Sequence, residues 1–158
     1  MDVQRHEYFM AMALREAEQA YEEGEVPVGA VVVFGDKVIG RGYNRTGQLH
    51  DATAHAEMIA LSAAYNYLGD WRLEKCELYC TLEPCAMCAG AAVLSRIQRV
   101  IFGARDPKFG ACGSIFMIPT DKRLNHRIDI VEGVLAEQVA SLMREFFVRV
   151  RERKEGIN

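Results

Sequence analysis

The sequence predicts an α/β protein of three layers, α/β/α, in which helices cover both faces of a central mixed five-stranded sheet. Short apolar runs alternate with longer amphipathic segments, in the order α-β-β-α-β-α-β-β-α. The strand-helix-strand unit at 77–103 implies parallel pairing, because such crossovers join parallel strands. Gly35-Asp36 separates two earlier strands and predicts an antiparallel hairpin.

The first elements follow from the pattern of apolar residues. Residues 4–22 carry one apolar stripe at helical spacing, and Gly24 ends that helix. Residues 28–34 are β-branched and almost wholly apolar, which is typical of a strand buried on both faces. We expect the second strand at 37–43 and a polar loop at 44–53.

The second half continues the alternation. Its expected elements are a helix at about 54–68, a strand at 77–81, a helix at 84–95, strands at 99–103 and 128–132, and a final amphipathic helix at about 135–153. Thr53 or Asp51 is available to cap the first of these helices, and Pro84 suits the first turn of the second. The Gly-containing stretch 104–127 is longer than a plain connection requires.

Composition restricts the class of protein. A chain of 158 residues, half of them apolar, is expected to form a single domain over 1–158 with a sizeable core. No run approaches the roughly 18 to 20 apolar residues of a membrane span, and the N-terminus does not resemble a secretory signal. The five cysteines are an odd number, which argues against a disulfide framework. We therefore expect a cytoplasmic protein that needs no membrane.

Charge is unevenly distributed along the chain. The net charge of −3 argues weakly against nucleic acid as a partner. However, residues 1–25 hold seven acidic side chains against two arginines, whereas residues 96–154 hold twelve basic side chains against seven acidic ones. The C-terminal third could therefore offer a basic face, although a solvated helix at each end would give the same asymmetry.

Two short segments have the composition of a metal site: His55-Ala56-Glu57 and Pro84-Cys85-Ala86-Met87-Cys88. Residues three apart share a helix face, so Cys85 and Cys88 can address one ion. The first helical turn also favours the thiolate forms that a metal needs. Two thiolates and the His55 imidazole make a three-ligand set, which is typical of catalytic zinc that keeps its fourth position for water.

Glu57 separates this pattern from a purely structural zinc site. It follows His55 by two residues, so its carboxylate should lie beside the metal and exchange protons with the bound water. A fourth protein ligand would close the site; the candidates are Cys76, Cys80, Cys112, His50 and His126. Cys80 is expected to be a packed, unligated thiol. A structural zinc site and a redox pair remain the alternatives.

The combined pattern H-x-E…P-C-x-x-C is the signature of the zinc nucleobase deaminases. The chain resembles, beyond this signature, the bacterial tRNA-specific adenosine deaminases of the cytidine-deaminase-like superfamily. The segments that carry the resemblance are 25–33, 43–57, 79–97, 100–114, 124–130 and 133–147. The resemblance therefore implies a cytidine-deaminase-like fold.

The resemblance also implies a set of site residues. It assigns one Zn2+ per subunit to His55, Cys85 and Cys88, and the proton shuttle to Glu57. Base and pocket contacts would come from the Asn44 side chain and from backbone near Ala56 and Pro84. Nucleotides that flank the target would meet Arg105, Asp106 and Lys108 on one loop, and Phe147 and Arg151 on the last helix. The family's enzymes act as homodimers in which the partner subunit shapes the substrate groove.

The implied reaction is the hydrolytic deamination of adenosine to inosine at the wobble position of a tRNA anticodon loop. Zinc-bound hydroxide would attack C6 of a flipped-out adenine while Glu57 moves the protons. Two alternatives remain: a deaminase of a free base or nucleoside (guanine, cytosine or cytidine), and a non-catalytic zinc module that binds RNA. Each contact also has a plainer interpretation, since Asn44 could be a turn residue, Asp106 and Lys108 solvated charges, Arg151 a solvated helix end and Phe147 a packing residue.

Overall fold

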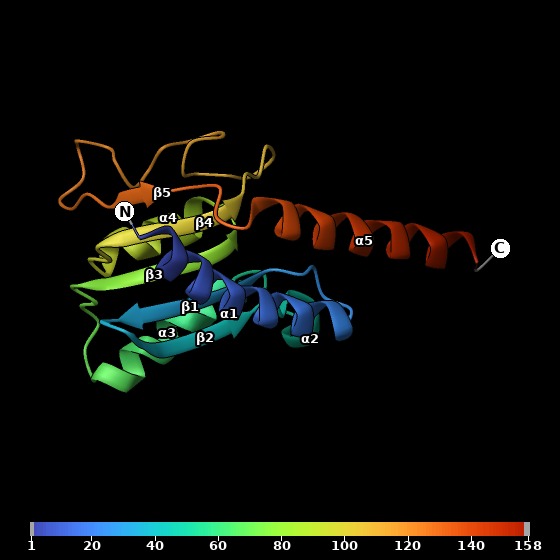
Figure 1. Cartoon of the computed structure of the whole chain (residues 1–158), viewed down its shortest axis with the longest axis horizontal. Coiled ribbons are helices and arrows are strands. Elements are labelled where there is room, and N and C mark those ends of the chain that lie inside the picture. Colours follow the sequence, from blue (N-terminus) through green and yellow to red (C-terminus); the bar gives the residue numbers. More distant parts are fainter. Residues whose placement is uncertain (1, 157–158) are drawn as a thin grey trace.

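A computed structural model describes residues 2–156, and in it a five-stranded sheet of order β2-β1-β3-β4-β5 lies between helices (Figure 1). The strands are β1 (Gly29–Phe34), β2 (Lys37–Tyr43), β3 (Cys76–Leu82), β4 (Arg99–Ala104) and β5 (Asp129–Val131). The helices are α1 (Val3–Glu22), α2 (Thr46–Leu49), α3 (Ala56–Leu68), α4 (Ala86–Leu94) and α5 (Ala136–Glu155). The predicted α/β class and the five-stranded sheet are confirmed.

The sheet is mixed in the way that the sequence predicts. β1 pairs antiparallel with β2 and with β3, so that Val31 stands opposite Arg41 on one side and Tyr79 on the other. β3 and β4 are parallel, with Cys80 beside Phe102, and β5 extends the parallel half. The parallel pairing of the strand-helix-strand unit and the antiparallel hairpin are therefore both confirmed.

Alternate strand residues supply two separate apolar layers. Val31, Val33 and Tyr79 pack beneath α1 and the entry to α5. The intervening residues, such as Val32 and Leu78, pack beneath α3 and α4. This period of two is the side-chain alternation of a strand, and it explains why β1 is apolar on both faces. Figure 1 shows α1 on one side of the sheet and α3 and α4 on the other.

Small residues let α3 lie unusually close to β2. A Cβ atom at Gly42 would lie 2.4 Å from the carbonyl oxygen of Ala56, and one at Gly40 would lie 2.2 Å from that of Ala60. Only glycine allows so close an approach of strand and helix backbones. The first turn of α3, which carries Glu57, is consequently fixed against the sheet.

The helix starts differ from the predicted ones. α3 begins at Ala56 and α4 at Ala86, so His55 and Cys85 are the N-cap residues rather than members of the first turns. The prediction that Thr53 or Asp51 caps α3 is wrong, because the Asp51 carboxylate accepts hydrogen bonds from Thr53 instead. Both N-cap residues keep their side chains free of capping bonds, which leaves these side chains available for another partner.

The predicted loop at 44–53 contains a short helix, α2. The carboxylate of Glu25 accepts hydrogen bonds from the backbone N–H groups of Gly47 and Gln48 at 3.2 and 2.6 Å. Glu25 is 6% exposed, so both hydrogen bonds are made to a buried carboxylate. A buried acid from a distant part of the chain thus holds this first turn, as carboxylates do at helix N-termini.

α5 starts against the sheet and then runs beyond it, so that its C-terminal end stands apart from the rest of the chain (Figure 1). Val139 and Phe146 are buried, and Phe146 packs edge-on against Tyr21 of α1. Phe147 and Val148 are exposed instead. Of the helices within residues 2–156, none has the length and apolarity needed to cross a membrane.

Candidate active site

The two predicted metal-ligand segments come together in space. Nδ1 of His55 lies 3.6 Å from the sulfur of Cys85 and 3.6 Å from that of Cys88. A tetrahedral zinc ion about 2.3 Å from sulfur and about 2.0 to 2.1 Å from nitrogen would hold such atoms about 3.6 Å apart. The side chains of His55, Cys85 and Cys88 therefore have the chemistry and the spacing of a zinc ligand set.

The ends of α3 and α4 account for this convergence. His55 precedes α3 and Cys85 precedes α4, and both residues have extended backbone that directs the side chain away from the helix axis. Cys88 lies in the first turn of α4, where free N–H groups and the helix dipole favour negative charge. This helix end therefore suits a thiolate ligand once a cation is bound beside it.

The two thiols of the cluster ionise differently from each other: the pKa of Cys85 is lowered, whereas the hydrogen bond with Cys85, together with burial, raises the pKa of Cys88 well above its ordinary value. Hydrogen bonds from Cys88 first, and from His55 as well, lower the pKa of Cys85 to about 4 despite its burial. The hydrogen bond with Cys85 raises the pKa of His55. By contrast, burial raises the pKa of Cys76 to about 11 and that of Cys112 to about 12. The Cys85 sulfur is thus ionised where a cation would bind, next to the second thiol of the cluster.

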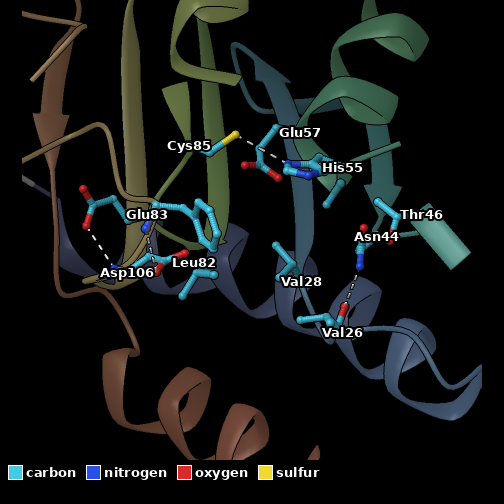
Figure 2. Close-up of a pocket in the computed structure, with 12 residues that line it drawn as sticks. Val26, Val28, Asn44, Thr46, His55, Glu57, Leu82, Glu83, Cys85 and Asp106 are labelled. Atoms are coloured by element: carbon cyan, nitrogen blue, oxygen red, sulfur yellow. Dashed lines mark hydrogen bonds between the residues drawn. The ribbon is translucent and has the colours of Figure 1, made fainter. Parts of the chain in front are cut away.

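Glu57 stands beside this cluster in the first turn of α3. Its side chain is 3% exposed, and its Oε1 atom has no hydrogen-bond partner within residues 2–156. Burial raises the pKa of Glu57 above its ordinary value. Figure 2 shows its carboxylate next to the His55 ring and the Cys85 side chain. A carboxyl group in such surroundings is suited to accept a proton and to return it.

A pocket of about 350 Å³ opens over the cluster. Its lining residues are Val26, Val28, Asn44, Thr46, His55, Ala56, Glu57, Leu82, Glu83, Cys85, Asp106 and Phe109. Most of the exposed lining surface is apolar, and polar side chains such as Asn44, His55 and Glu57 reach it at separate points (Figure 2). Such a combination is typical of a site for a small flat ligand whose polar groups fix its orientation.

Asn44 is the second buried residue of the pocket, after Glu57, that has an unpaired hydrogen-bond acceptor. It is 7% exposed, and its Oδ1 atom has no hydrogen-bond partner within the described residues. Its Nδ2 atom donates only a long bond of 3.4 Å to the carbonyl of Val26. Buried polar atoms without partners are uncommon in folded proteins. Asn44 and Glu57 therefore face the same pocket with unsatisfied acceptors.

The structure brings some of the predicted contact residues to the pocket and leaves others outside it. Ala56 and Asp106 are lining residues, together with Asn44 and Glu57. Outside the lining are Pro84, Arg105, Lys108, Phe147 and Arg151. Pro84 is buried, and its carbonyl accepts a hydrogen bond from the N–H of Ala111, so its neighbours Glu83 and Cys85 line the pocket in its place.

The predicted RNA-contact residues outside the pocket are exposed. The Arg105 guanidinium makes two hydrogen bonds of 3.0 Å to the carboxylate of Glu132, whereas Lys108 extends from the same loop. Phe147 is 47% exposed on α5, and Arg151 follows one turn later. These four side chains lie on the surface, where a macromolecule could reach them.

Several lining residues were not predicted from the sequence. Val28 belongs to the run interpreted as a buried strand, Val26 and Leu82 lie just outside the predicted strands, and Phe109 lies in a stretch without regular structure. Glu83 had a detectable signal, because it is an acid between an apolar strand and the Pro84-Cys85 pair. An acid in that setting is expected to be buried and bonded.

A His-Cys-Cys cluster beside a buried carboxylate, placed at two helix N-termini over a mixed sheet, defines the class of zinc-dependent deaminases. The model of the cytidine and deoxycytidylate deaminase zinc-binding region matches residues 3–104. The chain belongs to this family and, within it, to the tRNA-specific adenosine deaminases. Zinc is accordingly its cofactor.

Individual relatives agree with this assignment. The tRNA-specific adenosine deaminase of Streptococcus pyogenes serotype M18 (strain MGAS8232) is 46% identical over 149 residues, which cover 94% of each chain. A structure from studies of A-to-I editing by tRNA:A34 deaminases has a TM-score of 0.82 and 44% identity, with 85% of this chain and 98% of that chain covered. A guanine deaminase from Nitrosomonas europaea has a TM-score of 0.77 and 26% identity, with coverages of 89% and 83%.

Proposed function

We propose that the chain catalyses the hydrolytic deamination of adenosine to inosine at the wobble position of a tRNA anticodon. The observation that supports this most directly is the pocket: it is large enough to admit one base, and the unpartnered acceptors of Glu57 and Asn44 face it beside a zinc-type ligand set. The 46% identity to a tRNA-specific adenosine deaminase over almost the whole chain supports adenosine in tRNA as the substrate.

His55, Cys85 and Cys88 would hold one zinc ion per chain. Bound there, zinc supplies Lewis acidity that brings the pKa of a water toward neutrality. Glu57 would accept the proton of that water and deliver it to N1 of adenine, since its carboxylate is buried and its pKa is raised. Glu57 would then carry the proton of the new C6 hydroxyl to the amino group, so that the C6–N bond breaks, ammonia leaves and C6 keeps a carbonyl oxygen.

The remaining pocket residues would position the base. Asn44 presents its free Oδ1 acceptor to the pocket, and an N–H group of the base would satisfy it. Val28 and Phe109 offer apolar surface for the faces of the ring. A base stacked inside a duplex cannot enter such a pocket, so the target must be unpaired or flipped out, as in an anticodon loop.

The surface outside the pocket would contact the rest of the RNA. Arg105, Lys108, Phe147 and Arg151 are exposed and offer basic and aromatic groups to phosphates and splayed bases. A homodimer whose partner subunit completes the groove, and a cytoplasmic location, remain predictions. Light scattering of the zinc-loaded protein would measure the first of these.

Guanine deamination is the second candidate function. It is favoured by one observation, the similar fold of the guanine deaminase from Nitrosomonas europaea at 26% identity. The zinc ligands and the proton-transfer carboxylate would serve either reaction, so the metal does not distinguish them. The choice depends on the base contacts and on the exposed residues of the loop and α5.

The decisive experiment offers the zinc-loaded protein an arginine tRNA with adenosine at the wobble position, and in separate reactions guanine, cytidine and free adenosine. We expect inosine at the wobble position and ammonia from the tRNA reaction alone. The control is Glu57→Gln, which should keep zinc but lose at least about 100-fold in kcat. Turnover of guanine or cytidine without inosine in tRNA would overturn the proposal.

A further inference from the structure

Glu83 is a buried acid that the proposed chemistry does not use. It is 2% exposed and lies between the end of β3 and the Pro84-Cys85 pair. Both carboxylate oxygens accept hydrogen bonds, and every donor belongs to the segment 106–114. Oε1 accepts from the N–H of Asp106 at 3.0 Å and from the Ser114 hydroxyl. Oε2 accepts from the N–H groups of Cys112 and Ser114, each at 3.0 Å.

The segment 106–114 forms one wall of the pocket, because Asp106 and Phe109 are lining residues (Figure 2). It lies within a stretch that contains no helix or strand between Ala104 and Asp129. Backbone N–H groups that no helix or strand satisfies need other acceptors when they are buried. A carboxylate, with about four acceptor positions, can serve three N–H groups and one hydroxyl at once.

We infer that Glu83 is a positioning residue for substrate capture: its carboxylate ties the pocket wall 106–114 to the strand end that carries the metal ligand Cys85. The inference rests on the proposed function for its substrate, an adenosine in RNA. Glu83 acts through Asp106 and Phe109, which it holds at the mouth of the pocket. It does not exchange protons with the base.

The close packing around Gly110 supports this role independently of the hydrogen bonds. A Cβ atom at Gly110 would lie 2.3 Å from the carboxyl carbon of Glu83 and 2.4 and 2.5 Å from its oxygens. Gly110 also forms an isolated β-bridge with Cys85. The wall therefore packs directly on the Glu83 carboxylate and pairs with the backbone of Cys85, and only a residue without a side chain permits the contact.

Two substitutions reach this contact from opposite sides. Glu83→Gln keeps the shape but replaces one acceptor oxygen with a donor, which opposes the N–H groups of the wall. Gly110→Ala keeps the carboxylate and displaces the wall, so the test does not depend on the folding of one variant. Asp129→Asn is the matched control. It neutralises an exposed acid at the start of β5, where Asp129 stands beside Arg99 of β4 and away from Glu83.

The expected result has a kinetic and a structural part. With an anticodon stem-loop RNA as substrate, both variants should raise KM by about tenfold while kcat stays within about twofold, since the wall binds substrate and the proton-transfer groups are unchanged. Hydrogen exchange of the Cys112 and Ser114 amides should accelerate by about tenfold.

The double variant should have a KM little higher than that of the worse single variant, because both substitutions release the same contact. Zinc content should equal that of the unmodified protein, and Asp129→Asn should match it in every measurement.

Several results would overturn the inference. If Glu83→Gln leaves amide exchange unchanged, the carboxylate does not tether the wall. If it lowers kcat or releases zinc with KM unchanged, Glu83 acts through the metal ligand instead. If the unmodified protein fails to deaminate adenosine in RNA, the proposed function is wrong, yet the exchange measurement still decides whether Glu83 tethers the wall.

Discussion

Cys80 and Cys88 are both fully buried thiols, yet their surroundings differ. Cys88 lies in the first turn of α4 with its sulfur 3.6 Å from Nδ1 of His55. Cys80 lies inside β3, where burial keeps the pKa of its thiol well above the ordinary value. The prediction that Cys80 is packed and outside the ligand cluster is confirmed.

This difference makes a prediction about metal content. We expect Cys88→Ala to reduce bound zinc from about one ion per chain to nearly none after dialysis, because a site with two remaining ligands binds zinc weakly. The matched Cys80→Ala variant should retain its zinc, since it removes a thiol of the same burial outside the cluster. Elemental analysis of both purified proteins measures this. Equal zinc contents would contradict the assignment of Cys88 as a ligand.

The site residues that the sequence could predict are those with a local signal. His55, Glu57, Cys85 and Cys88 occupy a spacing that only metal chemistry explains well, and the structure brings the three ligand side chains together. Phe109 could not be predicted, because its contact with the pocket depends on the path of a long irregular stretch. That path depends in turn on hydrogen bonds to an acid more than 20 residues earlier.

At the scale of whole elements, a buried polar network joins α1 to β3. Nδ1 of His6 lies 2.8 Å from the Tyr79 hydroxyl, and Arg5 donates a hydrogen bond of 3.2 Å to the same oxygen. Arg5 can only donate, so the phenol oxygen accepts from it and the phenol hydrogen is available to Nδ1 of a neutral His6 ring. Burial lowers the pKa of His6, in agreement with a neutral ring.

The neutral His6 predicts how stability depends on pH. The pKa of His6 is lower in the folded chain than its unfolded value of about 6.5, so the unfolded chain takes up the proton first as pH falls. The contribution of His6 to the free energy of unfolding should therefore decrease below about pH 6.5 and be constant above it. Urea unfolding at several pH values would measure this.

The control for this prediction is His6→Asn, which keeps a hydrogen-bonding side chain but does not titrate. Its stability should change less between about pH 7.5 and 5.5 than that of the unmodified protein, because the other three histidines are common to both. Identical pH dependence in the two proteins would show that His6 titrates in the folded chain as it does in the unfolded one.

The element boundaries show where local patterns fail. The order of the predicted elements and their pairing are confirmed, because the apolar periods of two and of 3.6 residues are properties of the local sequence. α2 was missed, since the acid that holds its first turn, Glu25, is more than 20 residues away in the chain. α3 and α4 each start two residues later than predicted. His55 and Cys85 precede these helices as N-cap residues, and their side chains are zinc-ligand candidates that form no capping hydrogen bond.

At the scale of the whole molecule, α5 extends the protein far beyond the pocket. A helix of 20 residues is about 30 Å long, which is several times the width of one base. Arg149, Arg151, Arg153 and Lys154 all lie in its last two turns, where Figure 1 shows it clear of the sheet. This placement allows contacts with phosphates that are distant from the reacting adenosine.

We expect these contacts to depend on salt. Combined Arg151→Gln and Arg153→Gln should reduce the slope of log KM against log salt by up to about 1.4 for a tRNA substrate, because each phosphate contact contributes about 0.7 for single-stranded RNA. Stability should change by less than about 0.5 kcal/mol, since both side chains are exposed. Arg72→Gln, in an exposed loop after α3, is the matched control. An unchanged slope would remove α5 from the RNA-binding surface.

The ligand cluster also connects the two halves of the sheet. His55 follows the antiparallel hairpin, whereas Cys85 and Cys88 belong to the parallel strand-helix-strand unit, about 30 residues later. An ion bound by all three closes that loop, and its binding free energy adds to the resistance of the chain to unfolding and proteolysis. The lifetime of this enzyme would therefore rise and fall with the zinc supply of the cell, so that metal starvation would reduce its abundance as well as its activity.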